Sequence, residues 1–155
     1  MEVIDVNCNS NTSPLIKEGQ EGSCNLGCEP RDIQVVCRDI VIPSGQSVLA
    51  IQGDVNSSYR YFLLPKVTAY DDDITGGIIS VVVKRADNQT FEHIIENIEE
   101  KDNYIKIKWE LGKEDTEVPG ILQVMIKVVK KSEDEEISFV WQTFSANFTI
   151  EKSIK

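Results

Sequence analysis

From residue 33 onward, hydrophobic and polar residues alternate in short runs. The clearest run places Ile105, Ile107 and Trp109 on one face and two lysines and a glutamate on the other. A period of two residues predicts a strand with one buried and one solvated face. Alternating or strand-forming runs also occupy residues 33–41, 47–52, 59–65, 78–84, 122–128, 137–143 and 146–150, and residues 66–70 are expected to continue the 59–65 path past a bulge at Pro65.

Turn-forming residues separate these runs, and Pro43-Ser44-Gly45 and Pro119-Gly120 are the clearest of them. Residues 91–98 are ambiguous, because their apolar positions fit a helix as well as a strand. We expect a strand, since both neighbours are strands and a hairpin connection is short. Eight or so short strands without a long helix predict an all-β protein, an Ig-like antiparallel β-sandwich. Its expected core contains Ile107, Trp109, Val124, Ile126, Phe139, Trp141 and Phe148.

The first part of the chain follows a different pattern. All eleven aromatic residues lie from Tyr59 onward, whereas residues 1–31 are rich in Asn, Ser, Gly and Glu and show no regular period. This composition predicts an irregular N-terminal arm, ordered only when cysteines or a partner hold it. The expected organisation is an arm at 1–31 and an Ig-like β-sandwich domain at 32–155.

The net charge of the chain limits the classes of partner that it can bind. The formal net charge is -10, from 26 acidic and 16 basic residues. This balance argues against nucleic acid and against an anionic membrane surface, because both need a basic face. No apolar stretch approaches the ~20 residues of a membrane helix. The N-terminus has neither a basic start nor an apolar core, so we expect no cleaved secretion signal.

The four cysteines, Cys8, Cys24, Cys28 and Cys37, lie in the first quarter of the chain. A zinc site would use all four thiolates, but their spacing lacks the usual pair separated by two residues. Two disulfides would form under oxidising conditions. Free thiols, with Cys37 as a small core residue of a strand, are the favoured interpretation.

The chain offers no recognisable catalytic set. Its only histidine, His93, has no nucleophile motif around it, and its carboxylates cluster in acidic turns. The three consecutive carboxylates at 71–73 lack the alternate spacing of a calcium loop, so a solvated turn is expected. We therefore predict a protein that is not an enzyme and uses no cofactor.

A carbohydrate-binding module is the alternative from another functional class. Trp109 and Trp141 would form a sugar-stacking platform only if they faced outward, and their aliphatic alternation partners place them in the core instead. Such a module would then depend on exposed aromatic residues such as Tyr59 or Tyr61.

Several features follow one another in a fixed order from residue 49 to residue 150. They are Gln-Gly-Asp at 52–54 with Asn-Ser at 56–57, the strand Tyr-Phe-Leu-Leu-Pro at 61–65, the acidic loop at 71–73, the strand at 105–111 that contains Trp109, Gly120 before a long strand, and Phe-Val-Trp-Gln-Thr at 139–143 before the strand at 146–150. This ordered set resembles a β-sandwich module of tailed bacteriophages and prophages, the N-terminal domain of upper baseplate and tail-fibre proteins.

The resemblance implies a bacteriophage virion structural protein, an assembly or attachment module of the baseplate, tail or fibre. Capsid decoration and the anchor of a head fibre are the alternatives, because the cysteine-bearing first forty residues have no counterpart in such modules. The expected partners are other virion proteins, and two near-continuous apolar stretches predict a homo-oligomer. Assembly would take place in the host bacterial cytoplasm. The arm at 1–31, with Cys8, Cys24 and Cys28, is expected to dock on a neighbouring subunit.

Overall fold

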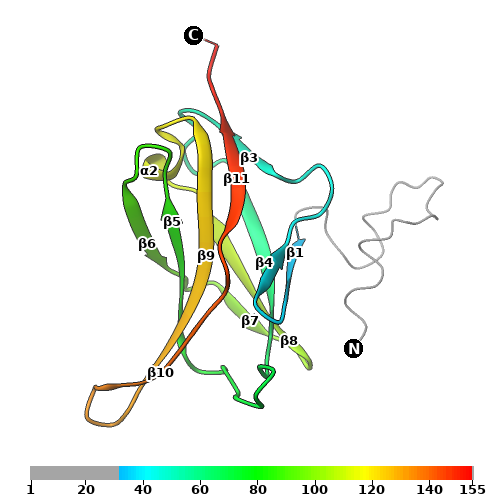
Figure 1. Ribbon diagram of the computed structural model, residues 1–155, viewed down its shortest axis with the longest axis vertical. Coiled ribbons are helices and arrows are strands. Elements are labelled where there is room, and N and C mark those ends of the chain that lie inside the picture. The colour runs from blue at the N-terminus through cyan, green and yellow to red at the C-terminus, as the bar shows by residue number, and fades with distance from the viewer. Residues whose placement is uncertain (1–31, 155) are drawn as a thin grey trace, which may run out of the picture.

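The computed structural model describes residues 32–154, which form two β-sheets packed face to face (Figure 1). The first sheet has the order β2 (Asp39–Val41), β1 (Asp32–Val36), β4 (Tyr59–Pro65), β8 (Tyr104–Glu110) and β7 (Ile98–Glu100). The second has the order β3 (Val48–Ile51), β11 (Ala146–Glu151), β9 (Gly120–Lys131), β5 (Ile78–Lys84) and β6 (Thr90–Ile94), and β10 (Ile137–Gln142) also pairs with β9. A single helical turn, α2 (Lys113–Thr116), connects β8 to β9.

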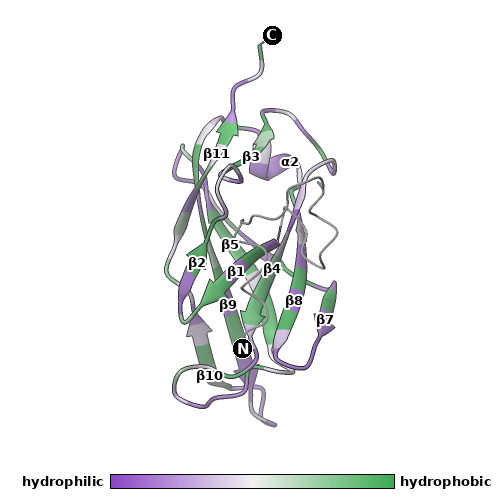
Figure 2. Cartoon of the chain, turned by 90° about the vertical axis from the view of Figure 1, so that its right-hand side faces the viewer, coloured by the Kyte–Doolittle hydropathy of each residue, from purple (hydrophilic) through white to green (hydrophobic). Residues whose placement is uncertain are grey.

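The core follows from the alternation in the sequence. On β9 every second residue from Leu122 to Val128 is buried, and on β8 the same holds from Ile105 to Trp109. Figure 2 shows hydrophobic residues along the strands and hydrophilic residues in α2. Six of the seven expected core residues are buried: Ile107, Trp109, Val124, Ile126, Trp141 and Phe148. Phe139 is only half-buried, and the pairing of β10 with β9 has a register shift between Ile137 and Phe139.

The all-β sandwich is therefore confirmed, with one difference in topology. Most neighbouring strands are antiparallel, but β1 pairs with β4 and β3 pairs with β11 in parallel. After the β1–β2 hairpin the chain crosses to the other sheet to form β3 and then returns to form β4. Because of this excursion, β1 and β4 run in the same direction, which the expected antiparallel sandwich did not include.

The run at 33–41 is a hairpin of two strands and not one strand. Cys37 lies at its turn with φ of 57°, in the left-handed region. Its side chain is exposed, and Val41 is also exposed. The expectation that Cys37 is a core residue of a strand is therefore wrong.

Two further segments differ from simple strands. Residues 66–70 do not extend β4; they form a loop in which Val67 makes an isolated bridge to Asp73. Residues 91–98 contain no helix, and strand is confirmed at 91–94 in β6 and at 98 in β7, but residues 95–97 are not strand and the segment is not a single strand. Between them the chain passes from one sheet to the other. Among residues 32–154, no helix has both the length and the apolar character to cross a membrane.

Candidate functional site

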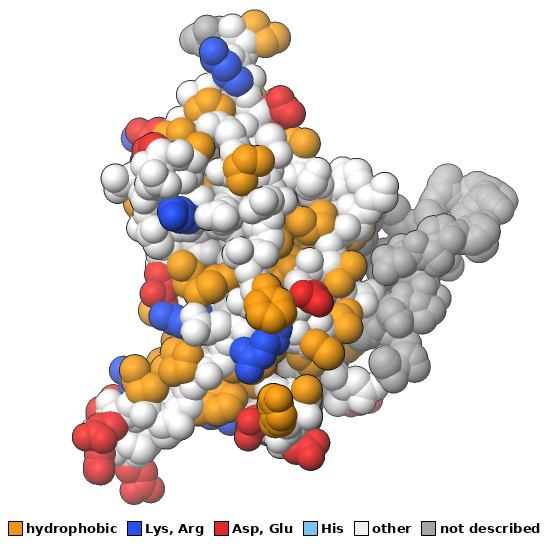
Figure 3. Space-filling view, in the orientation of Figure 1, with side chains coloured by type: hydrophobic (Ala, Val, Ile, Leu, Met, Phe, Trp, Pro, Cys, Tyr) orange, Lys and Arg blue, Asp and Glu red, His pale blue; other side chains and the backbone are white. Residues whose placement is uncertain are grey.

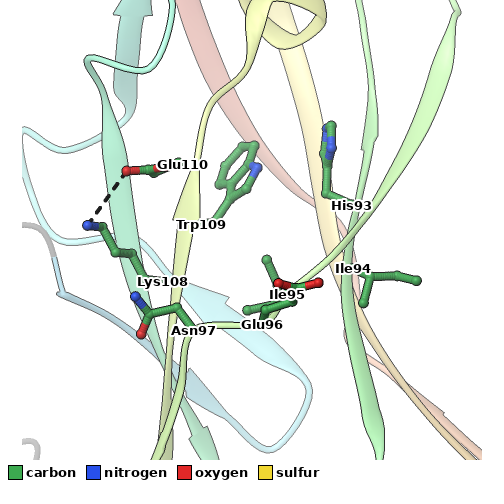
Figure 4. Close-up of a pocket in the computed structure, with 8 residues that line it drawn as sticks. All are labelled: His93, Ile94, Ile95, Glu96, Asn97, Lys108, Trp109 and Glu110. Carbon is green, nitrogen blue, oxygen red and sulfur yellow. Dashed lines mark ion pairs between the residues drawn. The ribbon is translucent and has the colours of Figure 1, made fainter.

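A cleft opens at the edge of the sandwich where the chain passes from β6 to β7 (Figure 4). We call it the Trp109 cleft. Its volume is about 340 Å³, and its walls are residues 93–97 and residues 108–110. Trp109 of β8 and His93 of β6 both extend into the space between the two strands. Lys108 and Glu110 form their ion pair, at 3.7 Å, on the other side of β8.

His93 is held from both sides by carboxylates. Its Nε2 lies 2.8 Å from Asp115 Oδ1, and its Nδ1 lies 3.7 Å from Glu114 Oε2. Asp115 is fully buried, and its other oxygen accepts a hydrogen bond from the backbone N–H of Gly112 at 2.8 Å. The hydrogen bond to Asp115 raises the pKa of His93, and burial opposes this effect. The pair therefore ties β6 to the helical turn α2.

Arg85 fixes the same helical turn from the end of the β5–β6 hairpin. Its Nη1 donates to the backbone oxygen of Glu114 at 3.0 Å and to Glu117 Oε1 at 3.1 Å. Its Nη2 forms an ion pair with Asp87 at 2.8 Å. The guanidinium also lies 5.0 Å from the centre of the Phe91 ring. Together with His93, these contacts position Glu114 and Asp115 beside the cleft.

The ring of His93 lies between two carboxylates, of which only Asp115 is within hydrogen-bond distance. His93, Glu114 and Asp115 place potential ligand atoms within 4.8 Å of one another. However, the two carboxylates face different ring nitrogens, as they would around an imidazolium ion, whereas a single metal ion binds one nitrogen of the ring. The sequence contained no signal that joins His93 to Asp115, which lies 22 residues away.

The indole N–H of Trp109 is the unusual group of the cleft. The side chain is only 1% exposed and stacks on Phe62, with ring centres 6.2 Å apart. Within residues 32–154, Trp109 Nε1 is buried and has no hydrogen-bond acceptor. A buried N–H is nearly always paired, because leaving it unpaired costs about 1–3 kcal/mol. This donor is therefore a local energetic cost of the packing around Trp109.

A second site lies at the end of the sandwich where the β4–β5 and β10–β11 loops meet. It is a groove of about 240 Å³, which we call the Tyr70–Phe144 groove. Tyr70 is 82% exposed and Phe144 is 63% exposed. Figure 3 shows hydrophobic side chains gathered around basic ones on the lower half of this face. The groove is lined by Cys37, Arg38, Asp39, Thr68, Ala69, Tyr70, Trp141 and Phe144.

The outer face of the first sheet carries tyrosines and lysines in register. Tyr59 and Tyr61 pack edge to face, with ring centres 5.6 Å apart. Lys108 lies 4.6 Å from the centre of the Tyr59 ring, and Lys106 lies 4.3 Å from that of Tyr61. Since an ammonium group covers a face of each ring, these tyrosines are poorly suited to stacking on a sugar.

Some of the remaining residues predicted for a site lie within residues 32–154, and others lie outside them. Cys37 is a free, exposed thiol at the rim of the Tyr70–Phe144 groove. Cys8, Cys24, Cys28 and the arm at 1–31 lie outside the described residues, so zinc, disulfides and docking of the arm stay predictions. The acidic segment at 71–73 is an exposed turn, in which Asp73 Oδ1 accepts from the backbone N–H of Thr75 at 2.8 Å.

Comparison with known proteins gives no family for the chain: no family model matches it, and no curated protein matches its sequence.

Proposed function

We propose that this chain is a structural module of a bacteriophage particle, which assembles through its surface and is not an enzyme. The observation that carries the proposal is the Tyr70–Phe144 groove, where two large aromatic side chains stand exposed at one end of a rigid sandwich. Exposed aromatic residues that border an apolar pocket are typical of the energetic centres of protein interfaces. The ordered resemblance to baseplate and tail-fibre modules supports the same class.

The partner that we infer at this groove is a second copy of the chain. Arg38 lies 5.7 Å from the centre of the Trp141 ring and donates to the backbone oxygen of Gln142 at 2.7 Å. The carboxylate of Asp39 borders the same groove and is exposed. A surface with a cation and an anion beside an apolar centre is complementary to itself, as a two-fold interface requires. Self-association of this kind also offsets the repulsion between two chains of net charge -10.

The proposed location of the chain is the virion, in the baseplate, tail or fibre. Capsid decoration or the anchor of a head fibre is the alternative. Other virion proteins are the further partners. Attachment to them is assigned to the arm at 1–31, which bears Cys8, Cys24 and Cys28. An irregular polar arm covers a large partner surface when it becomes ordered on binding, at the cost of its chain entropy.

Sedimentation and light scattering at increasing concentration test the self-association. The wild-type chain should form dimers or larger oligomers, and Tyr70→Ser combined with Phe144→Ser should weaken the association by about 1,000-fold, since each hot-spot residue contributes at least about 2 kcal/mol. Ile94→Ser is the matched control, because Ile94 is 65% exposed on β6, away from the groove. A strict monomer that binds no virion protein would overturn the proposal.

Deletion of residues 1–31 tests the role of the arm. The shortened chain should keep its melting temperature nearly unchanged, because the core residues of the described sandwich lie from Ile33 onward. Particles assembled with the shortened chain should fail to incorporate it. If the shortened chain unfolds, the arm belongs to the core; if it is still incorporated, attachment lies on the sheets.

A further inference from the structure

The free edge of strand β10 carries a further inference, which rests on the proposed self-association and concerns how the second copy is held. β10 pairs with β9 on one side, and no strand within residues 32–154 pairs with its other side. Figure 1 places β10 at the end of the molecule opposite to the C-terminus. An edge strand presents a row of backbone N–H and C=O groups that can pair with another chain.

Among the described edge strands, β10 is the least protected against such pairing. Native proteins protect edges with short strands, charged residues, prolines or bulges. β2, β7 and β6 have three to five residues, and each contains a charged residue. β3 is uncharged, but Arg60 and Asp54 bind its backbone, at 2.9 Å and 3.0 Å. β10 has six residues without a charge or a proline, and its register shift against β9 lies at its start, between Ile137 and Phe139.

The hydrogen bonds of the ladder show which residues of β10 face the free edge. Thr143, directly after β10, donates from its backbone N–H to the oxygen of Ile126 on β9 at 3.0 Å. Backbone groups along an antiparallel strand point alternately to either side, so those of Val140 and Gln142 point away from β9. The oxygen of Gln142 accepts from Arg38 at 2.7 Å. No such contact is made to the N–H or C=O of Val140 by residues 32–154.

The side chains on the outer face of the second sheet are also suited to self-pairing. An apolar row crosses three strands there, because Ile78 of β5 lies opposite Val129 of β9, and Val129 lies opposite Val140 of β10. Ile78 and Val140 are each 45% exposed. The row ends at the free edge, so a second copy related by a two-fold axis would continue it. The Val140 side chains of the two copies would then lie directly opposite each other, close enough to pack.

The charges around β10 favour antiparallel over parallel pairing. They comprise Arg38 and Asp39 at the groove, the acidic turn at 71–73, the three lysines of β9 and four acidic residues at 133–136 in the β9–β10 turn. The last is the largest group of one sign, and Figure 3 shows acidic side chains on this projecting hairpin. Parallel pairing would bring two such turns side by side, whereas antiparallel pairing holds them at opposite ends of the joint sheet.

We propose that two copies of the chain pair antiparallel along the free edges of β10, with the two-fold axis at Val140, so that their second sheets become one continuous sheet. The edge adjoins the Tyr70–Phe144 groove, since Trp141 is a wall of that groove and Phe144 follows the strand. The edge and the groove are therefore parts of one interface. The groove supplies apolar contact, and the edge supplies backbone hydrogen bonds and fixes the register.

Hydrogen exchange of single backbone amides tests the pairing directly. The full chain, labelled with ¹⁵N, is compared at concentrations below and above the dissociation constant of the dimer. The amide of Val140 should exchange at least about tenfold more slowly in the dimer, because it is open in the monomer and paired in the dimer. The amide of Trp141, the next residue, points to β9 and should be equally protected in both states.

The outcomes separate this inference from the proposed self-association. If the chain associates but Val140 stays unprotected, the strand pairing is wrong and the groove interface stands. If the chain remains monomeric, both are wrong. Protection of Val140 that is present at every concentration and disappears when residues 1–31 are deleted would identify the arm as the occupant of the edge, and would overturn the pairing of two copies.

A proline at the axis tests the backbone contact. Val140→Pro removes the N–H that faces the partner and leaves the ladder with β9 intact, as a proline on the open side of an edge strand does. It should weaken the association about 30-fold, because the interface loses one hydrogen bond from each copy. Val140→Ala is the matched control; it keeps the N–H and should weaken the association by no more than about fivefold. Equal weakening by both variants would contradict the backbone pairing.

Opposite charges at position 140 test the register and do not depend on whether proline is tolerated. Val140→Lys and Val140→Glu each place like charges opposite each other across the axis, so each variant alone should associate at least about tenfold more weakly than the wild type. An equimolar mixture should form a mixed dimer with an affinity within about threefold of the wild type, since opposite charges then face each other. If the mixture associates no better than the separate variants, Val140 does not lie at the axis and the proposal is wrong.

Discussion

The two tryptophans of the chain begin from the same sequence pattern and end in different surroundings. Both lie at inward positions of alternating strands, and both are buried. Trp109 lies at the wall of a polar cleft with its N–H buried and without an acceptor within residues 32–154, whereas Trp141 forms a wall of a groove that exposes Tyr70 and Phe144. Alternation therefore decides that a residue is buried, but the neighbouring strands decide what its ring contacts and which kind of ligand can reach it.

Short strands create both openings. The ladder between β7 and β8 covers β8 only from Ile105 to Ile107, so the stretch around Trp109 has no third strand beside it. On the other sheet, β10 pairs with one half of β9 and β11 with the other half. The loop between β10 and β11 carries Phe144 beside the groove. Each candidate site thus lies where one strand ends and the next has not begun.

The largest expected effect is on packing at Trp141. Trp141→Ala should lower the free energy of unfolding by about 3–5 kcal/mol, because it leaves a cavity behind the groove. Ile137→Ala on the same strand is the control; its side chain is exposed, so the change should stay within about 0.5 kcal/mol. Urea unfolding measures both. A loss below about 1 kcal/mol at Trp141 would mean that the ring packs only at the surface.

The next effect tests the carboxylate behind the Trp109 cleft. Asp115→Asn keeps the shape of the buried side chain but removes the charge that faces His93, so we expect a loss of about 1–3 kcal/mol. Glu114→Gln is the matched control, since Glu114 is partly exposed and lies farther from the ring, at 3.7 Å, and it should change stability by less than about 0.5 kcal/mol. If the two losses were equal, Asp115 would contribute no more than an exposed ion pair.

The pH dependence of stability follows from the same pair. The folded pKa of His93 lies above its ordinary value of 6.5, so the folded state holds this proton more tightly than the unfolded state does. The stabilisation is fully present below about pH 6.5 and disappears as pH rises through the folded pKa. The lowered pKa values of Asp73, Asp87 and Glu92 act at acid pH and do not overlap with this window. His93→Gln should remove the decline between neutral and alkaline pH in urea titrations; an unchanged decline would assign it to another group.

The strands were predictable because local alternation specifies them. The alternation in the sequence predicts both the position and the buried face of strands β4, β5, β8, β9 and β11. Pro43 predicts the break that follows the first run. The turn at Cys37 was not predictable, because a cysteine in the left-handed region carries none of the usual Gly or Asn signal. The pair of His93 and Asp115 was not predictable either, since it depends on how β6 and α2 meet in space. Non-local contacts of this kind leave no periodic signal.

The smallest expected effect on the free energy of unfolding concerns the indole N–H of Trp109. Trp109→Phe shortens the ring but also removes an N–H that has no acceptor within residues 32–154. The stacking on Phe62 is kept, and removal of the unpaired donor recovers part of the free energy lost with the smaller ring. We therefore expect a change within about 1 kcal/mol, whereas Trp109→Ala should cost about 3–5 kcal/mol. If the phenylalanine variant lost as much as the alanine variant, the N–H would already be paired in the folded protein.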